Sequence, residues 1–258
     1  MKKKCRLNLI IYELRNINGN LMPHFFGIVF PNVMTFLLAR VVGSQMPAGM
    51  QREAATSVML TMSLVMPMST MLLGYGCLYS TEIERGIPSR IHLFGIHPAS
   101  EITAKIIAEL IFLTITFLIF GIFQTAVMDV QRPAFFSLVC LIVSLYLLGI
   151  ILLVISHSIA AMCKKFSLTF GITMALYFAF MILTGMMGIR TDQLPKPMQA
   201  VARTLPMTYI SSDFIDFWQG GSYNFMPMLQ SFLFFGSAAG ILFLISSQWK
   251  RKSSAAGL

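Results

Sequence analysis

Charges of alternating sign mark one short segment of the chain, residues 81–105, which reads TEIERGIPSRIHLFGIHPASEITAK. A Gly-Ile-Pro break at residues 86–88 predicts a new short helix beginning at Ser89. Glu84 and Arg85 have the character of surface charges placed for contact with a soluble protein, because opposite charges orient a partner. The alternative is a solvated loop whose arginines only fix the orientation of the chain in a membrane.

No other set of reactive side chains has the spacing of a catalytic or metal site. The four cysteines include no Cys-x-x-Cys pair, and no cluster has metal-ligand spacing, so neither zinc nor a disulfide is expected. No nucleophile lies beside a base, and no Gly-x-x-x-x-Gly-Lys-Ser/Thr loop is present to cradle phosphates. We therefore expect no catalytic residues, no metal and no cofactor bound by this chain.

Charged residues next to the long apolar stretches have structural explanations. Glu101, Lys105 and Glu109 follow one another at steps of four and can stack on one helix face, which favours an anchoring ladder of salt bridges over a role in transport. His157 is expected to be a hydrogen-bonded packing residue. No chain of acids suggests a proton relay, which argues against an ion-coupled transporter.

Long uncharged stretches define the elements that must position these residues. Six of them lack Asp, Glu, Lys and Arg, and each is close to or above the ~20 residues that a helix needs to cross a bilayer. They are residues 16–39, 54–81, 110–128, 133–163, 166–189 and 217–249. Backbone groups inside a bilayer must pair within the protein, so such spans are helices. The chain is predicted to be an all-α polytopic membrane protein with six transmembrane helices, a single domain over residues 1–258.

Basic residues gather on one side of the predicted membrane. If the helices alternate in direction, thirteen of the 19 lysines and arginines fall on the side of both termini and six on the other. The positive-inside rule then predicts that both termini are cytoplasmic, as is the segment at residues 81–100. No basic patch interleaved with aromatic residues suggests binding to nucleic acid.

Two further segments are expected to be helical without crossing the membrane. Apolar side chains at helical spacing in residues 6–20 predict a short interfacial helix, and the alternative is that they merely begin a long first span. Residues 189–224 form the longest external segment, and apolar spacing after two prolines predicts two short external helices there. Pro31 and Pro67 lie inside spans and are expected to kink them.

The connector after the second span resembles the corresponding loop of the ABC-2 type permeases, the membrane subunits of bacterial ATP-binding-cassette exporters. The family's pattern of acids, base, glycine and a later arginine before a lysine is matched by Glu82, Glu84, Arg85, Gly86, Arg90 and Lys105. The chain departs from the pattern at Ile87, where threonine is usual, and at His97 and Pro98, which stand in for a displaced Thr-Pro pair.

An external segment carries a second resemblance to the same family. The stretch LPKPMQAVARTLPMTYISSDFIDFW is similar to the family's segment after the fifth helix. The matching residues are Leu194, Pro195, Gln199, Leu205, Pro206, Thr208 and Tyr209. Physically, the prolines fix the turns that fold the short helices back over the outer mouth.

The resemblance implies partners that the chain lacks. It implies a pair of cytoplasmic ATPase subunits, which hold ATP and Mg, and a second permease chain, identical or homologous. It also implies that the connector couples to the ATPase and that the fifth helix lines the interface between permease chains, with Tyr177 and Met181 where cargo passes. We expect a protein of the bacterial cell membrane, in contact with membrane lipids, that exports an amphiphilic or apolar cargo such as a drug, lipid or antimicrobial peptide.

Other functions stay open at this point. A permease for a polymer such as a lipid-linked glycan would need polar and aromatic residues along its channel. A membrane-embedded enzyme would need a nucleophile and base, or a metal cluster, at one depth. A non-transporting immunity or sensor protein would need no ATPase partner.

Overall fold

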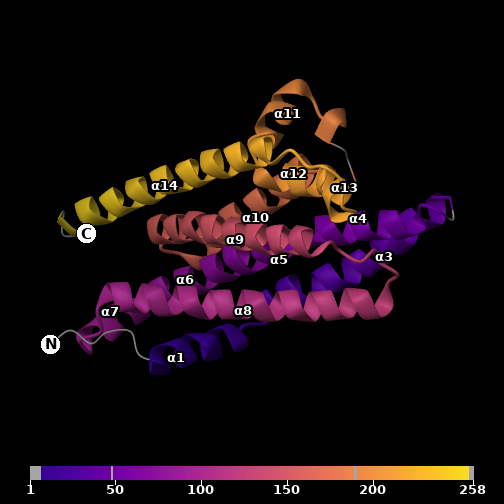
Figure 1. The fold of residues 1–258 in the computed structure, drawn as a ribbon. Coiled ribbons are helices and arrows are strands. Elements are labelled where there is room, and N and C mark those ends of the chain that lie inside the picture. Colours follow the sequence, from indigo (N-terminus) through magenta and orange to yellow (C-terminus); the bar gives the residue numbers. More distant parts are fainter. Residues whose placement is uncertain (1–6, 48, 189–190, 256–258) are drawn as a thin grey trace.

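The computed structural model describes residues 7–47, 49–188 and 191–255, and in this part of the chain every regular element is a helix. Six helical spans are long and apolar enough to cross a membrane. They are Leu21–Gln45, Gln51–Glu84, Pro98–Val127, Phe135–Cys163, Phe166–Leu183 and Phe225–Trp249. The prediction of an all-α polytopic membrane protein with six spans is therefore confirmed (Figure 1).

The second span lies at the centre of the bundle. It consists of α4 (Gln51–Ser63), α5 (Val65–Pro67), the π-helical η2 (Met68–Gly74) and α6 (Tyr75–Glu84). In its most apolar window 78% of the residues are buried, against 28–50% in the other five spans. Its buried serine and threonine residues fit this environment because their hydroxyls bond to carbonyls about one turn earlier, as Thr70 does to Met66.

Pro31 and Pro67 each lie next to a π-helical turn. The first span consists of α2 (Leu21–His24), η1 (Phe25–Val29) and α3 (Phe30–Gln45), with Pro31 in the first turn of α3. Pro67 directly precedes η2. Proline has no N–H to donate and its ring crowds the preceding turn, so the regular ladder is interrupted at these places. Gly27 of η1 lies against η2, where an added Cβ would come within 2.8 Å of Thr70.

The N-terminal helix is separate from the first span. The helix α1 (Leu7–Asn18) ends before Gly19, and the Asn20 side chain caps the start of α2. α1 packs along α8 (Pro98–Val127) and buries Glu13 and Ile17 there. The apolar spacing in this helix does not include Glu13, since it is formed by Leu7, Ile10, Ile11, Leu14 and Ile17. The burial of Glu13 depends on its distant partner Lys105 on α8.

The remaining spans differ from prediction at their ends. The helix α9 (Phe135–Cys163) turns through Lys164, at φ 55°, into α10 (Phe166–Leu183). We expected this fifth span to reach Gly188, but it ends earlier, where Gly185 and Gly188 adopt positive φ. The last helix, α14 (Phe225–Ala255), was expected to end at Gln248 and instead continues through the basic residues that follow.

The segment between α10 and α14 folds over one end of the bundle (Figure 1). It contains the 3-10 turn η3 (Thr191–Gln193) and three short helices, α11 (Lys196–Ala202), α12 (Pro206–Ser212) and α13 (Phe214–Trp218). Two helices were predicted here. The second is divided at Asp213, whose φ of −110° interrupts the helix.

Candidate functional site

A short helix projects from the end of the bundle opposite α11–α13. The helix α7 (Ile87–Leu93) follows α6 after Gly86, whose φ of 67° is a left-handed conformation that favours glycine. The chain then enters α8, where the His97 side chain accepts a hydrogen bond from the Ala99 N–H. Figure 1 shows α7 at the same end as the last turns of α14. The predicted helix in this connector exists and begins two residues before Ser89.

The surface of this connector combines apolar and basic side chains. Leu93 is 87% exposed and Phe94 is 78% exposed, although both are large and apolar. Arg85 and Arg90 are exposed beside them. An exposed apolar pair with adjacent charge is typical of a protein contact surface. The sequence analysis missed Leu93 and Phe94, whose signal was two consecutive large apolar residues in a connector rich in charge.

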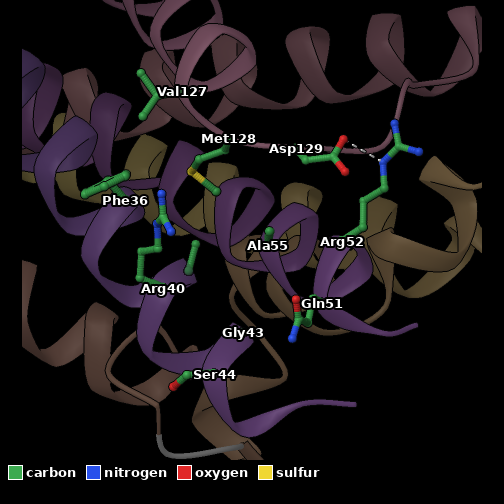
Figure 2. A pocket seen from close by; sticks show the side chains of 11 residues that line it. Phe36, Arg40, Gly43, Ser44, Gln51, Arg52, Ala55, Val127, Met128 and Asp129 are labelled. Carbon is green, nitrogen blue, oxygen red and sulfur yellow. Dashed lines mark ion pairs between the residues drawn. The ribbon is translucent and has the colours of Figure 1, made fainter. Parts of the chain in front are cut away.

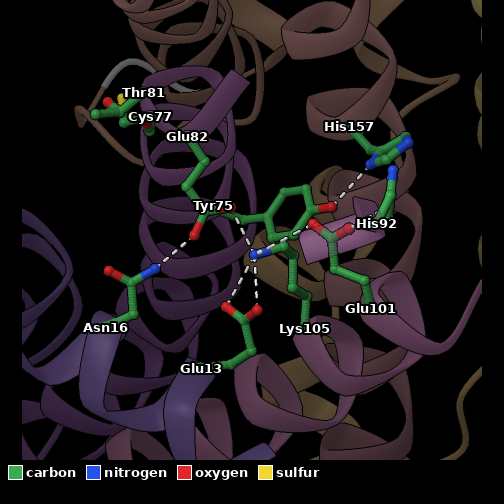
Figure 3. Close-up of polar contacts among 10 residues, drawn as sticks. All are labelled: Glu13, Asn16, Tyr75, Cys77, Thr81, Glu82, His92, Glu101, Lys105 and His157. Carbon is green, nitrogen blue, oxygen red and sulfur yellow. Dashed lines mark hydrogen bonds and ion pairs between the residues drawn. The ribbon is translucent and has the colours of Figure 1, made fainter. Parts of the chain in front are cut away.

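A buried ion cluster lies beneath the connector (Figure 3). The Lys105 ammonium donates to both carboxylate oxygens of Glu13, at 2.8 and 2.9 Å, and to Glu82 Oε2 at 2.5 Å. All three side chains are at most 5% exposed. They come from α8, α1 and α6, so the cluster joins three helices that are far apart in the sequence.

Further polar contacts extend the cluster to α7. His92 on α7 lies 2.8 Å from Glu101 Oε2, and Glu101 Oε1 lies 3.9 Å from Lys105 Nζ. On the other side, the Asn16 side chain of α1 donates to Glu82. Buried charges are tolerated only when they are paired and hydrogen-bonded, so these helices depend on one another's positions.

Acidic groups outnumber basic groups around Lys105. Glu109, one helical turn beyond Lys105, is only 2% exposed, and with Glu13, Lys105 and Tyr75 it lines a cavity of about 10 Å³. Burial raises the pKa of Glu13 to about 7, because the loss of hydration outweighs the attraction of Lys105. The cluster thus contains a carboxyl group that titrates near neutral pH.

The five predicted coupling residues have three different environments. Glu82 lies in the buried cluster and is 2% exposed, so it does not face a partner in this conformation. Glu84 accepts a hydrogen bond of 2.9 Å from the Phe166 N–H, the first residue of α10. Gly86 forms the turn, and Arg85 and Arg90, like Glu84, are exposed at the surface. Their part in coupling stays a prediction.

The external motif holds its short helices together through local bonds. The Gln199 side chain donates to the Asp192 and Leu194 carbonyls. The Thr208 hydroxyl donates to the Ala202 carbonyl at 2.6 Å, and Tyr209 donates to the Arg203 carbonyl at 2.9 Å. Prolines and a buried leucine define the helix starts: Pro195 caps α11, Leu205 caps α12 and Pro206 occupies its first position. These residues therefore fix turns, as the proline spacing predicted.

The two residues predicted to line a cargo path are buried among other residues of this chain. Tyr177 is 1% exposed and Met181 is 7% exposed, and both belong to the main hydrophobic core. The outward face of α10 is formed by other residues, among them Ile172 and Phe178. A second chain packed on α10 would contact that face first, so a role of Tyr177 and Met181 in transport stays a prediction.

The other ionisable groups form no recognisable reactive site in the described part of the chain. No group of three or more His, Cys, Asp or Glu side chains there has the arrangement of a metal site. His157 lies 2.7 Å from the Tyr75 hydroxyl and stacks on Tyr79, so it is a hydrogen-bonded packing residue as expected.

Comparison with known families gives a match over most of the chain. The family model described as ABC-2 type transporter matches residues 9–216. This stretch begins in α1 and ends in α13, so it includes the connector, the buried ion cluster and the external motif. No curated protein and no solved structure matches the chain.

Proposed function

Because the chain belongs to the ABC-2 type transporter family and is thus a membrane component of an ABC transporter, we propose that it is the permease subunit of a bacterial exporter. In this proposal a separate pair of ATPase subunits hydrolyses ATP with Mg. Two permease chains, identical or homologous, form the path through the cell membrane. Both termini and α7 lie in the cytoplasm, in keeping with the thirteen basic residues on that side.

The exposed tip of α7 is the observation that carries this proposal. Leu93 and Phe94 present apolar surface at the end of the bundle from which α7 projects, with Arg85 and Arg90 beside them. Exposed apolar side chains in a connector are costly unless a partner covers them. We assign this surface, residues 85–94, to docking of the ATPase subunit.

In this proposal the contacts beneath α7 transmit a movement of α7 to the helices of the bundle. A shift of α7 acts on Glu101 through His92, and on Glu13 and Glu82 through Lys105. The bond from Glu84 to the first residue of α10 makes a second link, to the fifth span. ATP-driven closure of the ATPase pair would therefore displace α1, α6, α8 and α10 together.

The proposed cargo is amphiphilic or apolar. The outward face of α10 is apolar, with Ile172 and Phe178 exposed, and suits contact with a second permease chain or with cargo. The Tyr177 hydroxyl is buried and has no hydrogen-bond partner among the described residues, so it offers a polar contact if α10 moves. Met181 beside it is a flexible side chain that repacks around varied shapes.

The docking proposal is tested by replacing Leu93 and Phe94 together with serine and co-purifying the ATPase subunit. We expect the ATPase to be lost while the permease still inserts, because an exposed pair contributes little to the fold. Phe135→Ser is the matched control, since Phe135 is 84% exposed at the start of α9, at the opposite end. Full retention of the ATPase by the Leu93/Phe94 variant would exclude this surface as the docking site.

A further inference from the structure

Two adjoining cavities lie at the end of the bundle away from α7. The first, of about 490 Å³, is formed by α3, α4 and the end of α8 (Figure 2). Apolar residues such as Phe36 and Val127 form part of its walls, and its polar lining residues include Arg40, Ser44, Gln51 and Arg52. Figure 2 shows the Arg52 side chain directed to Asp129, at 3.1 Å. The cavity is therefore a chamber with two guanidinium groups.

The second cavity is an apolar groove of about 740 Å³ between α4, α8 and α9. Phe117, Leu118, Ile122, Leu141 and Ile142 contribute to its walls. Several of these side chains are also exposed on the outside of the bundle, Ile122 to 69% and Leu118 to 59%. Because α8 and α9 are membrane spans, a groove flanked by such residues opens toward the hydrocarbon of the bilayer.

The two cavities meet at three residues that line both, Arg52, Met128 and Asp129. Arg132 lines the groove. The charged residues that line the two cavities are therefore three arginines and one aspartate, with a net charge of two positive. A cationic chamber joined to an apolar groove at the edge of a membrane is complementary to an anionic amphiphile, whose charged headgroup and apolar tail match the two cavities.

A buried hydrogen-bond acceptor in the groove restricts which headgroup the ligand can carry. The Gln131 side chain lines the groove, and its Oε1 is buried without a hydrogen-bond partner among the described residues. Such an oxygen is satisfied by a ligand that donates a hydrogen bond. A glycerol headgroup has hydroxyl donors, whereas a choline headgroup has none and adds a positive charge next to the arginines.

We propose that these cavities bind one molecule of an anionic phospholipid with a hydroxyl-bearing headgroup, such as phosphatidylglycerol. The phosphate binds at Arg52, with Arg40 on the chamber side and Arg132 on the groove side. The headgroup hydroxyls lie where the two cavities meet and donate to Gln131, and an acyl chain lies in the groove. On the orientation proposed above, this lipid belongs to the outer leaflet. None of the lining residues lies on α10, so the site is separate from the proposed cargo path.

Fluorescence of Trp218 provides a direct test. The chain has two tryptophans; Trp218 lines the groove, and Trp249 lies near the C-terminal end of α14. In a Trp249→Phe background, purified full-length protein in detergent is titrated with lipids brominated on the acyl chains. Brominated phosphatidylglycerol is expected to quench Trp218 at about tenfold lower concentration than brominated phosphatidylcholine. Equal quenching by both lipids would overturn the proposal.

Two variants test the headgroup and the tail separately. Arg40→Gln with Arg132→Gln is expected to weaken phosphatidylglycerol about tenfold, since hydrogen bonds to charged groups are the strong ones. Arg203→Gln, which removes an exposed arginine of the 191–224 segment, is the control and is expected to change nothing. An equal loss in both would show that only overall charge matters.

Gly121→Leu tests the groove. Gly121 lines it within α8, and an added Cβ would meet no atom within 4 Å, so leucine fills groove space without a backbone clash. This variant is expected to reduce quenching by brominated phosphatidylglycerol several-fold, whereas Gly171→Leu, at an equally open position of α10, leaves it unchanged. Full displacement of the lipid by millimolar inorganic phosphate, or unchanged quenching in Gly121→Leu, would contradict binding through the acyl chain.

Discussion

The two ends of the bundle are held together by different kinds of interaction. At the α7 end, Lys105 joins Glu13 and Glu82 across three helices, through charged groups that are at most 5% exposed. At the other end, Thr208 and Tyr209 bond to carbonyls six residues before them. Longer-range bonds between neutral groups also join the helices there, from the Ser137 hydroxyl to the Phe217 carbonyl and from the Trp218 indole N–H to the Gln131 carbonyl. Removing one member of a network of buried charges leaves the others uncompensated, so the helices at the α7 end depend more strongly on one another than helices joined by neutral hydrogen bonds.

This difference fits the roles proposed for the two ends. The α7 end has an exposed apolar pair, Leu93 and Phe94, above a cluster that reaches four helices. The opposite end has a packed aromatic group in which Phe217 contacts Phe214, Tyr223 and Phe225. Buried charges make the positions of α1, α6 and α8 strongly dependent on one another, so we propose the first end as the moving interface and a covering role for the second.

The largest effect is expected for Lys105→Met. Removing the ammonium leaves the Glu13 and Glu82 carboxylates buried without a counter-charge, which typically costs ~3–5 kcal/mol in the free energy of unfolding. Thermal unfolding of purified protein should show a large fall in melting temperature. Lys165→Met is the control, because Lys165 is exposed at the same end of the bundle. Equal stability of the two variants would mean that the cluster does not hold the helices together.

Combining Glu13→Gln with Lys105→Met sharpens this test. If the two groups act through each other, the double variant should be less destabilised than the sum of the single variants. Strict additivity would contradict a direct ion pair.

The pH dependence of stability should come next in size. The pKa of Glu13 is raised to about 7 by burial, above its ordinary value of 4.5. The folded protein then holds a proton that the unfolded chain releases, so this group stabilises the fold at low pH and the contribution is lost as pH rises from about 4.5 through 7. The charges of Lys105, Glu82 and Glu101 also affect the pKa of Glu13. The pH range over which stability changes is therefore a property of the whole cluster.

Melting temperatures measured across this window test the assignment. Glu13→Gln cannot titrate and should flatten the slope of stability against pH. Asp216→Asn, at an exposed position of α13, should leave the slope as it is. A slope unchanged by Glu13→Gln would contradict the assignment to Glu13.

The smallest effect is expected for Thr208→Val at the opposite end. The substitution removes the hydroxyl that bonds to the Ala202 carbonyl, which costs about 1 kcal/mol. Because the bond is local, the variant should keep its ATPase partner and its ATP-dependent export. A fall in melting temperature as large as that of Lys105→Met, or loss of the ATPase partner, would contradict the distinction between the two ends.

The six spans were predictable because length and absence of charge are properties of the chain itself. The turn at Gly86 was equally readable, since a glycine before Ile-Pro marks a helix start. The ion pair of Glu13 with Lys105 was not, because its partners are 92 residues apart and only packing of α1 on α8 brings them together. For the same reason, the pattern of α1 alone placed Glu13 on the wrong face.

The end of the fifth span could not be predicted from composition, because the residues after it are also uncharged. The uncharged stretch around Met186 predicted a longer fifth span, but positive φ at Gly185 and Gly188 ends the helix before it. Tyr177 and Met181 were predicted from the family resemblance to face a partner chain. Their burial in this chain depends on how α10 packs against α6 and α9, which no spacing within α10 reveals.

The central claim is that the α7 end, and not the opposite end, meets the ATPase. A photoreactive amino acid placed at Leu93, in full-length permease co-expressed with its ATPase subunit, tests this contact in intact cells. The same residue at Phe135 serves as the comparison, because it is equally exposed at the other end. The account predicts a cross-link to the ATPase from Leu93 and none from Phe135. A cross-link from Phe135, or none from Leu93 with both subunits present, would contradict it.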